Sequence, residues 1–490
     1  MKQSALIVLV MLVTAVTAIP QDATRLTEER AVELALEENL GIRSQLQSLS
    51  VKERDRRTAW NQLYPSVQLS GTVNRNNLEQ EISSLVPTGS PGPDGSFDSV
   101  RPLEETAPRW SVSGQLSAQL DLSLRMYYAI QQTAVDLREG RLSLADAQDR
   151  VVRDARKQFR RVLLLQRALD LARRRLETAS EEVDEARVNV ENGLSDRSAL
   201  LQAQIQHANT EVALQEQENA LAAARRGMKS TLGLGLEEEV ILEVGSDTHV
   251  TLPGDEGEPP GETVAASRLP RFDRGALEEE FLSGSRELQN LTVQMERLET
   301  LQRLERAGLF PVVRLSFTAD PAFQGDPFED SWIEDVDEAW QQQRGAFSIT
   351  VSQPLDPFIP GSSAWTAMAN YDDQIAELRY QTEQVRDGAR LEVASLLDTL
   401  RSVRTTVRAR ELNLELALRN LELARQGLES GNRGRLDVRR AEDARAEAEL
   451  NLAQEVNTYY TTLVDLAYAL NTDVDTLLSH AEGSQVQSGR

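Results

Sequence analysis

The sequence predicts an α+β fold built from two tandem copies of one unit, which combines a few β-strands with very long α-helices. The segment LYPSVQLS at 63–70 returns as LFPVVRLS at 309–316. Short stretches alternate apolar and polar residues with a period of two, which is typical of strands with one apolar face. Longer stretches without proline are rich in helix-forming residues, and the longest cover 123–192 and 362–429.

Three matches in the same order indicate the duplication. Their members lie 246, 235 and 238 residues apart, for the pairs Pro65 and Pro311, Asp121 and Asp356, and Gly193 and Gly431. The offset changes only where loops can absorb it. We therefore expect a first repeat at 19–242, a linker at 243–271, a second repeat at 272–478 and a C-terminal tail at 479–490.

The N-terminus indicates export. Lys2 precedes the apolar run 5–16, and Val16-Thr17-Ala18 has the small residues that signal peptidase accepts. A membrane anchor is the alternative, but the run is shorter than the roughly 20 residues that a spanning helix needs. We expect a signal peptide at 1–18.

Composition excludes several classes of function. The chain has 78 acidic and 53 basic residues, and its formal net charge of −25 repels nucleic acid. It has no cysteine, and its 3 histidines lack the spacing of metal ligands. No phosphate-binding or nucleophile motif occurs, and acidic pairs such as Glu181-Glu182 are interpreted as solvated helix faces. We expect no enzyme, no metal and no cofactor.

Each repeat begins with a helix, a strand and a long polar connection to a returning strand. The first connection is rich in Pro, Gly and Ser, and the second is acidic. Long loops on one side of a sheet are typical of outer-membrane strands, although a soluble sheet with one buried face is the alternative. The expected elements are a helix at 27–62 with strands at 65–76 and 109–122, and a helix at 273–308 with strands at 311–319 and 345–353.

Long helices follow each strand pair, at 123–192 and 195–232 in the first repeat and at 362–429 and 435–477 in the second. With apolar residues at coiled-coil spacing, they must pack in antiparallel pairs. A fibrous coiled coil is the alternative, but it gives the four strands no purpose. Four strands are too few to close a membrane barrel, so several chains must share one.

Four features of the sequence resemble TolC-like outer-membrane efflux proteins. They are the export signal, the opening helix, the join from proline to strand, and the run GNRGRLDVRRAEDARAEAELNLAQEVNTYYTTLVDLAYALN at 431–471. The resemblance covers nearly the whole mature chain, twice over. It implies a homotrimer with four strands per chain in a shared twelve-strand barrel in outer-membrane lipid, continued by a helical coiled-coil tunnel across the periplasm. It also implies a passive duct of a tripartite efflux or type I secretion system for small molecules or proteins, opened by a periplasmic adaptor and an inner-membrane transporter.

The resemblance also assigns residues at the far end of the tunnel. Asp437 falls where the family often places a carboxylate that narrows a closed aperture. The family's second acid is Arg440 here, and its tyrosine before the turn glycine is Leu428. We therefore expect Arg433, Arg439 and Arg440 to pair with Asp437 across chains, although Asp437 is alternatively a solvated helix carboxylate. The expected adaptor-docking tips are Asn192, Gly193, Leu194, Gly431, Asn432 and Gly434.

Two rival functions remain open from the sequence. A periplasmic adaptor protein needs only one helical hairpin, followed by Gly- and Val-rich domains that the sequence lacks. A non-channel cell-envelope coiled-coil scaffold needs the helices but no strands that face lipid. Membrane fractionation separates the scaffold from the channel.

Overall fold

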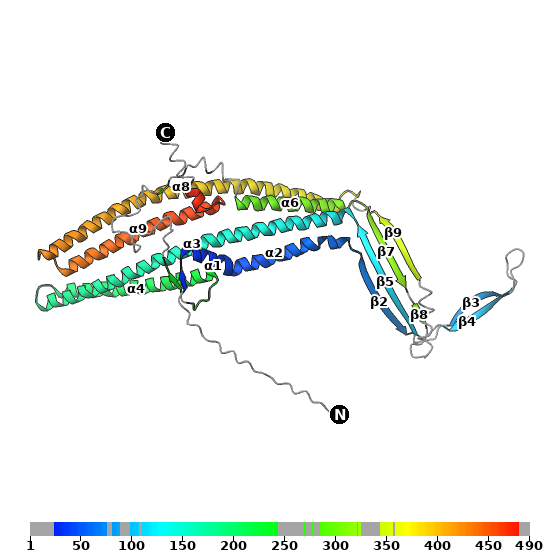
Figure 1. Cartoon of the computed structure of the whole chain (residues 1–490), viewed down its shortest axis with the longest axis horizontal. Coiled ribbons are helices and arrows are strands. Elements are labelled where there is room, and N and C mark those ends of the chain that lie inside the picture. Colours follow the sequence, from blue (N-terminus) through cyan, green and yellow to red (C-terminus); the bar gives the residue numbers. More distant parts are fainter. Residues whose placement is uncertain are drawn as a thin grey trace, which may run out of the picture. The chain divides into compact units, whose positions relative to one another are not determined.

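The computed structural model describes residues 24–75, 81–88, 99–106, 110–238, 240–243, 269–270, 272, 277, 285–320, 322–324, 344–355 and 358–479. The expected signal peptide lies outside these residues, as do the linker apart from residues 243, 269 and 270 and the tail apart from Ser479. The described chain is mostly helical with a small antiparallel sheet, in agreement with the α+β prediction (Figure 1).

The helices are α1 (Glu28–Glu38), α2 (Leu40–Thr58), the 3-10 turn η1 (Ala59–Leu63), α3 (Leu124–Glu191), α4 (Arg197–Leu232), α6 (Arg286–Ala307), α8 (Ser363–Glu429) and α9 (Arg435–Ala469). The strands are β1 (Thr24–Leu26), β2 (Ser66–Arg75), β3 (Glu81–Thr88), β4 (Ser99–Thr106), β5 (Trp110–Leu122), β6 (Val240–Leu242), β7 (Val312–Asp320), β8 (Ala322–Gln324) and β9 (Arg344–Ser352).

The chain divides into two compact units. Unit 1 contains residues 1–47, 142–289 and 383–490, and unit 2 contains residues 48–141 and 290–382. The helices α2, α3, α6 and α8 contribute residues to both units. Because neither α3 nor α8 contains a proline, each continues without interruption over 68 and 67 residues respectively.

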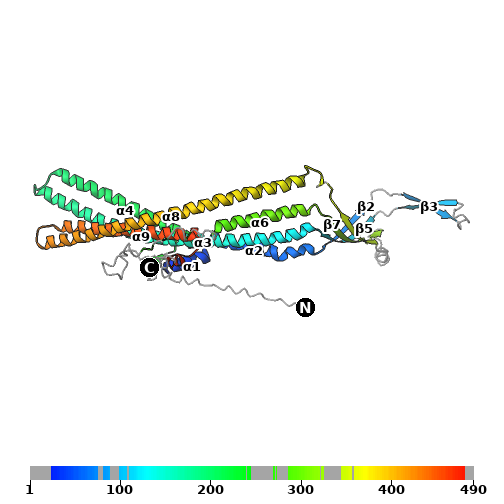
Figure 2. The same ribbon diagram turned by 90° about the horizontal axis from the view of Figure 1, so that it is seen from above.

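Unit 1 is built from two antiparallel helix pairs, α3 with α4 and α8 with α9 (Figures 1 and 2). Each pair has its own apolar seam, formed by residues at helical spacing. The first seam also includes α1 and β1, and its largest fully buried members are Leu26, Phe159, Met228 and Leu232. The second seam includes Val407, Leu452, Val456, Leu463 and Leu466.

The two return helices end in the same backbone conformation. Gly233 after α4 and Asn471 after α9 have positive φ values of 74° and 53°, the left-handed region that ends many helices. The amide of the residue after each donates to a carbonyl five residues earlier, Leu234 to Lys229 and Thr472 to Ala467, at 2.9 Å in both cases. A side chain at position 233 would collide with the Glu38 carbonyl. The equivalent position of the second copy is Asn471, so a side chain is accommodated there.

Unit 2 contains the sheet in the order β2-β5-β7-β9, with all neighbours antiparallel and β8 paired to β5 beyond β7. The first polar connection, expected to be a loop, contains the antiparallel hairpin β3–β4. Ile82, Leu85 and Val86 are strand-forming residues, but the Pro- and Gly-rich segment that follows them dominates the sequence pattern. The second connection lies largely outside the described residues.

Candidate functional site

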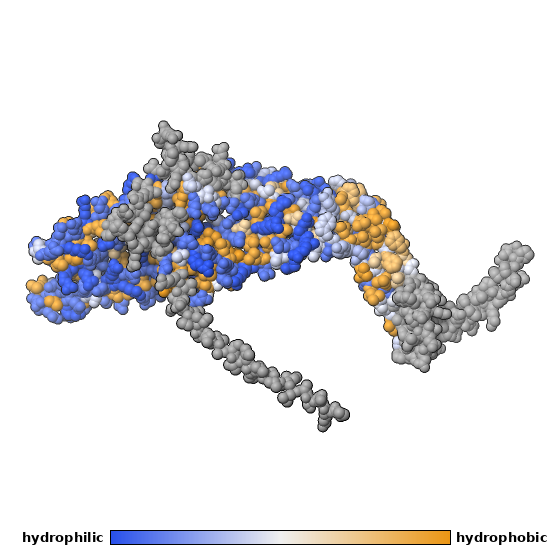
Figure 3. Space-filling model, viewed as in Figure 1, coloured by the Kyte–Doolittle hydropathy of each residue, from blue (hydrophilic) through white to orange (hydrophobic). Residues whose placement is uncertain are grey.

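The sheet of unit 2 has one continuous apolar face. The register places apolar residues opposite apolar residues in every ladder, for example Leu69 with Leu116, Leu120 with Leu315, and Phe317 with Phe347. Directly opposite residues share a face, and alternate residues along a strand share it too. Figure 3 shows apolar side chains gathered over these strands.

This apolar face is exposed in the single chain. Leu69 is 79% exposed and Val351 is 66% exposed, although both are large aliphatic residues. A contiguous exposed apolar surface indicates contact with another protein or with lipid. The other exposed members are Val67, Val73, Leu116, Leu122, Phe317, Phe347 and Ile349.

The opposite face of the sheet is polar and hydrogen-bonded across strands. The Arg314 guanidinium donates to both Asp121 carboxylate oxygens at 2.7 and 3.1 Å. The Ser316 and Ser348 hydroxyls are hydrogen-bonded at 2.6 Å. Cross-strand polar pairs of this kind suit a surface in contact with water.

Both outer strands of the sheet leave an edge open. Within the described part of the chain, β2 pairs only with β5 and β9 pairs only with β7. Unpaired N–H and C=O groups along an edge are a template for a further strand. Since neighbours alternate in direction along β2-β5-β7-β9, β2 and β9 themselves run in opposite directions.

The two helix-pair turns of unit 1 have the same hydrogen bonds. In the first turn, the amides of Leu194 and Ser195 donate to the Asn189 carbonyl at 2.8 and 3.3 Å. In the second turn, the amides of Asn432 and Arg433 donate to the Gly427 carbonyl at 2.8 and 3.1 Å. Gly193 and Gly431 take the left-handed conformation in the middle of each turn, with φ of 71° and 73°. The six expected tip residues therefore lie in or next to two equivalent turns, Asn192 to Leu194 and Gly431 to Gly434.

Asp437 caps the start of α9. Its Oδ2 accepts the Gly434 amide at 3.1 Å, which satisfies one of the free amides at the helix N-terminus. The aliphatic stem of Arg433 lies against Gly427, where a side chain would collide with it. Asp437 and Arg433 do not form an ion pair with each other within the described chain. Pairing of Asp437 with arginines across chains therefore stays a prediction.

Arg439 and Arg440 instead connect α9 to α3. Arg439 donates to Glu177 at 3.2 Å and to Glu181 at 3.0 Å, and Arg440 donates to Glu182 at 2.8 Å. The charge of Glu177, followed by that of Glu181, raises the pKa of Arg439 above its usual value. Glu181 and Glu182 are partly exposed, as expected for a helix face, but they also pair with α9. This contact was not predicted, because the sequence does not show which helix lies beside α3.

Further polar contacts join the same two helices along unit 1. Lys157 contacts both oxygens of Asp465 at 2.8 and 2.7 Å, and Arg175 contacts Glu447 at 2.7 Å. The α3–α9 contact therefore includes a series of ion pairs. Each helix pair has an apolar seam, with ion pairs such as Arg425–Glu442 at 2.9 Å beside it.

A further ion pair, which joins α3 to α1, is buried. Arg160 donates to Glu28 at 2.8 Å, and the side chains of the two residues are only 3% and 6% exposed. The Tyr460 hydroxyl donates to the other Glu28 oxygen at 2.7 Å, and the Arg160 guanidinium lies 3.4 Å from the centre of the Tyr460 ring. Burial raises the pKa of Tyr460, so its hydroxyl remains a donor. This cluster of α1, α3 and α9 residues was not predicted, because no local pattern marks partners so distant in sequence.

Other kinds of site are not found in the described part of the chain. None of its helices is both long and apolar enough to cross a membrane. No group of three or more His, Cys, Asp or Glu side chains in the same residues is arranged to hold a metal ion.

Comparison with known proteins identifies the family. The family model described as outer membrane efflux protein matches residues 31–234 and 277–472. A search of curated proteins finds no match.

Solved structures with the same fold include three outer-membrane proteins. VceC from Vibrio cholerae is 15% identical, with 91% of this chain and 96% of VceC covered at a TM-score of 0.64. The CmeC channel of Campylobacter jejuni is 12% identical, with 93% of this chain and 89% of CmeC covered at a TM-score of 0.65. The open-state MtrE channel of Neisseria gonorrhoeae is 15% identical, with 91% of this chain and 89% of MtrE covered at a TM-score of 0.64. The family match spans both halves of the chain, and the chain therefore belongs to the outer membrane efflux protein family, whose members are outer-membrane transport channels.

Proposed function

We propose that the chain is the outer-membrane exit duct of a tripartite efflux or type I secretion system. Three copies form a shared twelve-strand barrel, with four strands from each chain, and the paired helices continue it as a tunnel in the periplasm. The duct is passive for small molecules or proteins. It opens when a periplasmic adaptor protein and an inner-membrane transporter act on the tips of the helix pairs.

The open edges of the sheet carry this proposal. A sheet whose edges stay unpaired in lipid leaves backbone groups without hydrogen bonds, which is costly where no water is present. Because β2 and β9 run in opposite directions, β9 of one copy can pair with β2 of the next as an antiparallel neighbour. Repeating this contact around a threefold axis closes the barrel and removes every edge.

The dimensions and rims of the sheet support a barrel in lipid. β2 has 10 residues and β7 and β9 have 9 each, close to the roughly 9–11 residues of a tilted membrane strand. Aromatic residues beside the strand ends are exposed rather than packed, as expected for an interfacial belt. They are Tyr64, Phe310, Phe358 and Trp365.

The equivalent turns and helix ends support the proposed tandem duplication. Both copies have the same hydrogen bonds at their tips and at the ends of α4 and α9, always 238 residues apart. A duplicated unit supplies two similar helix pairs per chain, which suits a tunnel with near-uniform walls.

The purified protein is expected to be a trimer that conducts ions in a planar bilayer. Size measurement in neutral detergent with cross-linking gives the copy number, and single-channel recording gives the conductance. A scaffold or adaptor would give no conductance, and a monomeric, water-soluble protein would contradict the shared barrel.

Removing Arg440 is expected to favour the open state of the tip. Arg440→Ala breaks the contact with Glu182, which joins the two helix pairs. An exposed ion pair contributes at most about 1 kcal/mol, so we expect an increase in open probability of about two- to fivefold. Single-channel recording measures this change.

The matched control is Arg419→Ala, because within the described part of the chain Arg419 pairs with Glu415 of its own helix α8 and joins no two helices. Asp437→Ala is expected to lower the cation preference if three Asp437 carboxylates converge at the aperture. If Arg440→Ala and Asp437→Ala both behave like the control, the constriction lies elsewhere.

A further inference from the structure

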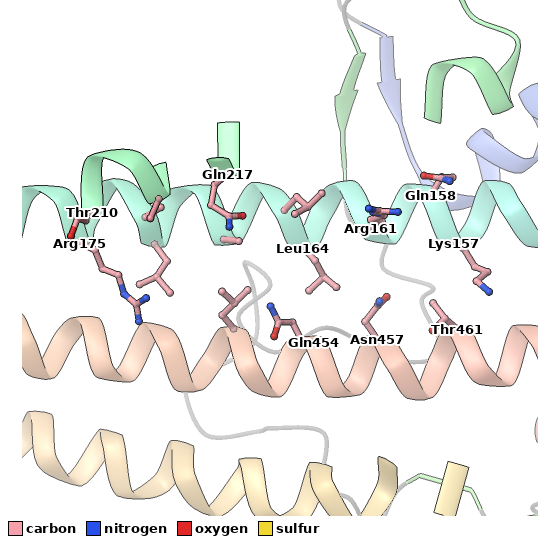
Figure 4. A pocket seen from close by; sticks show the side chains of 16 residues that line it. Lys157, Gln158, Arg161, Leu164, Arg175, Thr210, Gln217, Gln454, Asn457 and Thr461 are labelled. Carbon is pink, nitrogen blue, oxygen red and sulfur yellow. The ribbon is translucent and has the colours of Figure 1, made fainter. Parts of the chain in front are cut away.

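A groove of about 650 Å³ lies in unit 1 between α3, α4 and α9 (Figure 4). This volume is within the usual range for small-molecule sites. One part of its wall is apolar, with Leu164, Ala168 and Leu171 from α3 and Leu450 from α9. The groove can therefore cover an apolar body of moderate size.

The charged residues that line the groove are all cations. Lys157 and Arg175 are neutralised by Asp465 and Glu447, and neither carboxylate lines the groove. Arg161 has no ion-pair partner among the described residues. A groove with an unpaired cation and no acidic lining residue contrasts with the formal net charge of −25 for the chain.

Amide side chains complete the lining. Gln217 comes from α4, and Gln454 and Asn457 come from α9. The Asn457 Oδ1 atom is buried and has no hydrogen-bond partner among the described residues. Because this oxygen has almost no accessible surface, a ligand in the groove does not reach it, and the amides that it can reach supply neutral polar lining.

We propose that this groove binds an amphipathic anion. The apolar body lies against Leu164, Ala168 and Leu450, and a carboxylate or sulfonate accepts hydrogen bonds from Arg161. The site lies on helices α3, α4 and α9 of unit 1 and needs no open state of the tip.

Cysteine labelling can test the site, because the chain has no cysteine of its own. In Ala168→Cys protein, reconstituted in phosphatidylcholine nanodiscs, the labelling rate with an anionic methanethiosulfonate is measured with and without decanoate. We expect decanoate to slow labelling at least fivefold, whereas decyltrimethylammonium of the same chain length does not. Ala208→Cys, on the exposed part of α4 outside the groove, is the matched control and should be labelled equally under all conditions.

The role of Arg161 is tested in the same assay. Arg161→Gln should weaken protection by decanoate about fivefold, as expected for one exposed charged contact. Arg174→Gln, which removes an exposed arginine of α3 outside the groove, should leave protection unchanged. The proposal would be overturned if decanoate and decyltrimethylammonium slowed labelling equally. It would also be overturned if decanoate protected the protein with Arg161 and the Arg161→Gln variant equally. Failure of the Ala168→Cys variant to react in the assembled protein would show that another copy of the chain covers the groove, which would also overturn it.

Discussion

Arginine at Leu69 is expected to abolish stable assembly in the outer membrane, whereas arginine at the next residue, Ser70, is tolerated. Leu69 lies on the apolar face of β2 opposite Leu116, and Ser70 lies on the polar face opposite Gln115. A charged side chain on the lipid face costs about 2–4 kcal/mol near the bilayer midplane, and a trimer carries three copies of it. On the polar face the guanidinium remains in water.

The comparison is measured as the fraction of heat-labile trimer on electrophoresis of outer-membrane fractions. Val351→Arg and Thr350→Arg repeat the comparison on β9, the other edge strand, because Val351 pairs with Val313 and Thr350 pairs with Arg314. Thr350→Arg adds a like charge beside Arg314, so Ser70→Arg is the cleaner control. Equal loss of trimer for both faces would show that the sheet is not embedded in lipid.

The period-two pattern of the strands was sufficient to predict the faces of the sheet. Val67 and Leu69 alternate with Gln68 and Ser70 in the sequence, and the register keeps this alternation across the sheet. The periodicity is local, and a shift by one residue would turn every side chain to the wrong face. The family was also predicted correctly, because the order of motifs survives where sequence identity is low.

Contacts between distant helices could not be predicted in the same way. Glu181 and Glu182 look like solvated acids in α3, and their arginine partners are about 260 residues away. The cluster of Glu28, Arg160 and Tyr460 was not predicted for the same reason, because its members come from three different helices. Amphipathic periodicity predicts which face of a helix is apolar but not which helix lies opposite a charged residue.

Loss of Arg160 is expected to destabilise the contact of α1 and α9 far more than loss of the nearby Lys157. Among the described residues, Arg160→Met leaves the buried Glu28 carboxylate with only the Tyr460 hydroxyl as a partner. Removing one partner of a buried ion pair typically costs about 3–5 kcal/mol, because the remaining charge stays away from water. The Arg160 contact with the Tyr460 ring is lost as well.

Lys157 provides the matched control, because it also joins α3 to α9 but its side chain is 37% exposed and that of Asp465 is 31% exposed. Hydrogen exchange of amides in α1 and around Tyr460 in α9 reports the local opening free energy without unfolding the whole assembly. We expect exchange to be at least about a hundredfold faster in Arg160→Met, against about fivefold or less in Lys157→Met. The double variant Glu28→Gln/Arg160→Met should recover much of the loss, because no uncompensated charge remains and the amide oxygen still accepts from Tyr460. Equal exchange in Arg160→Met and Lys157→Met would mean that the buried pair contributes no more than an exposed one, and that the apolar seams alone hold α9 in place.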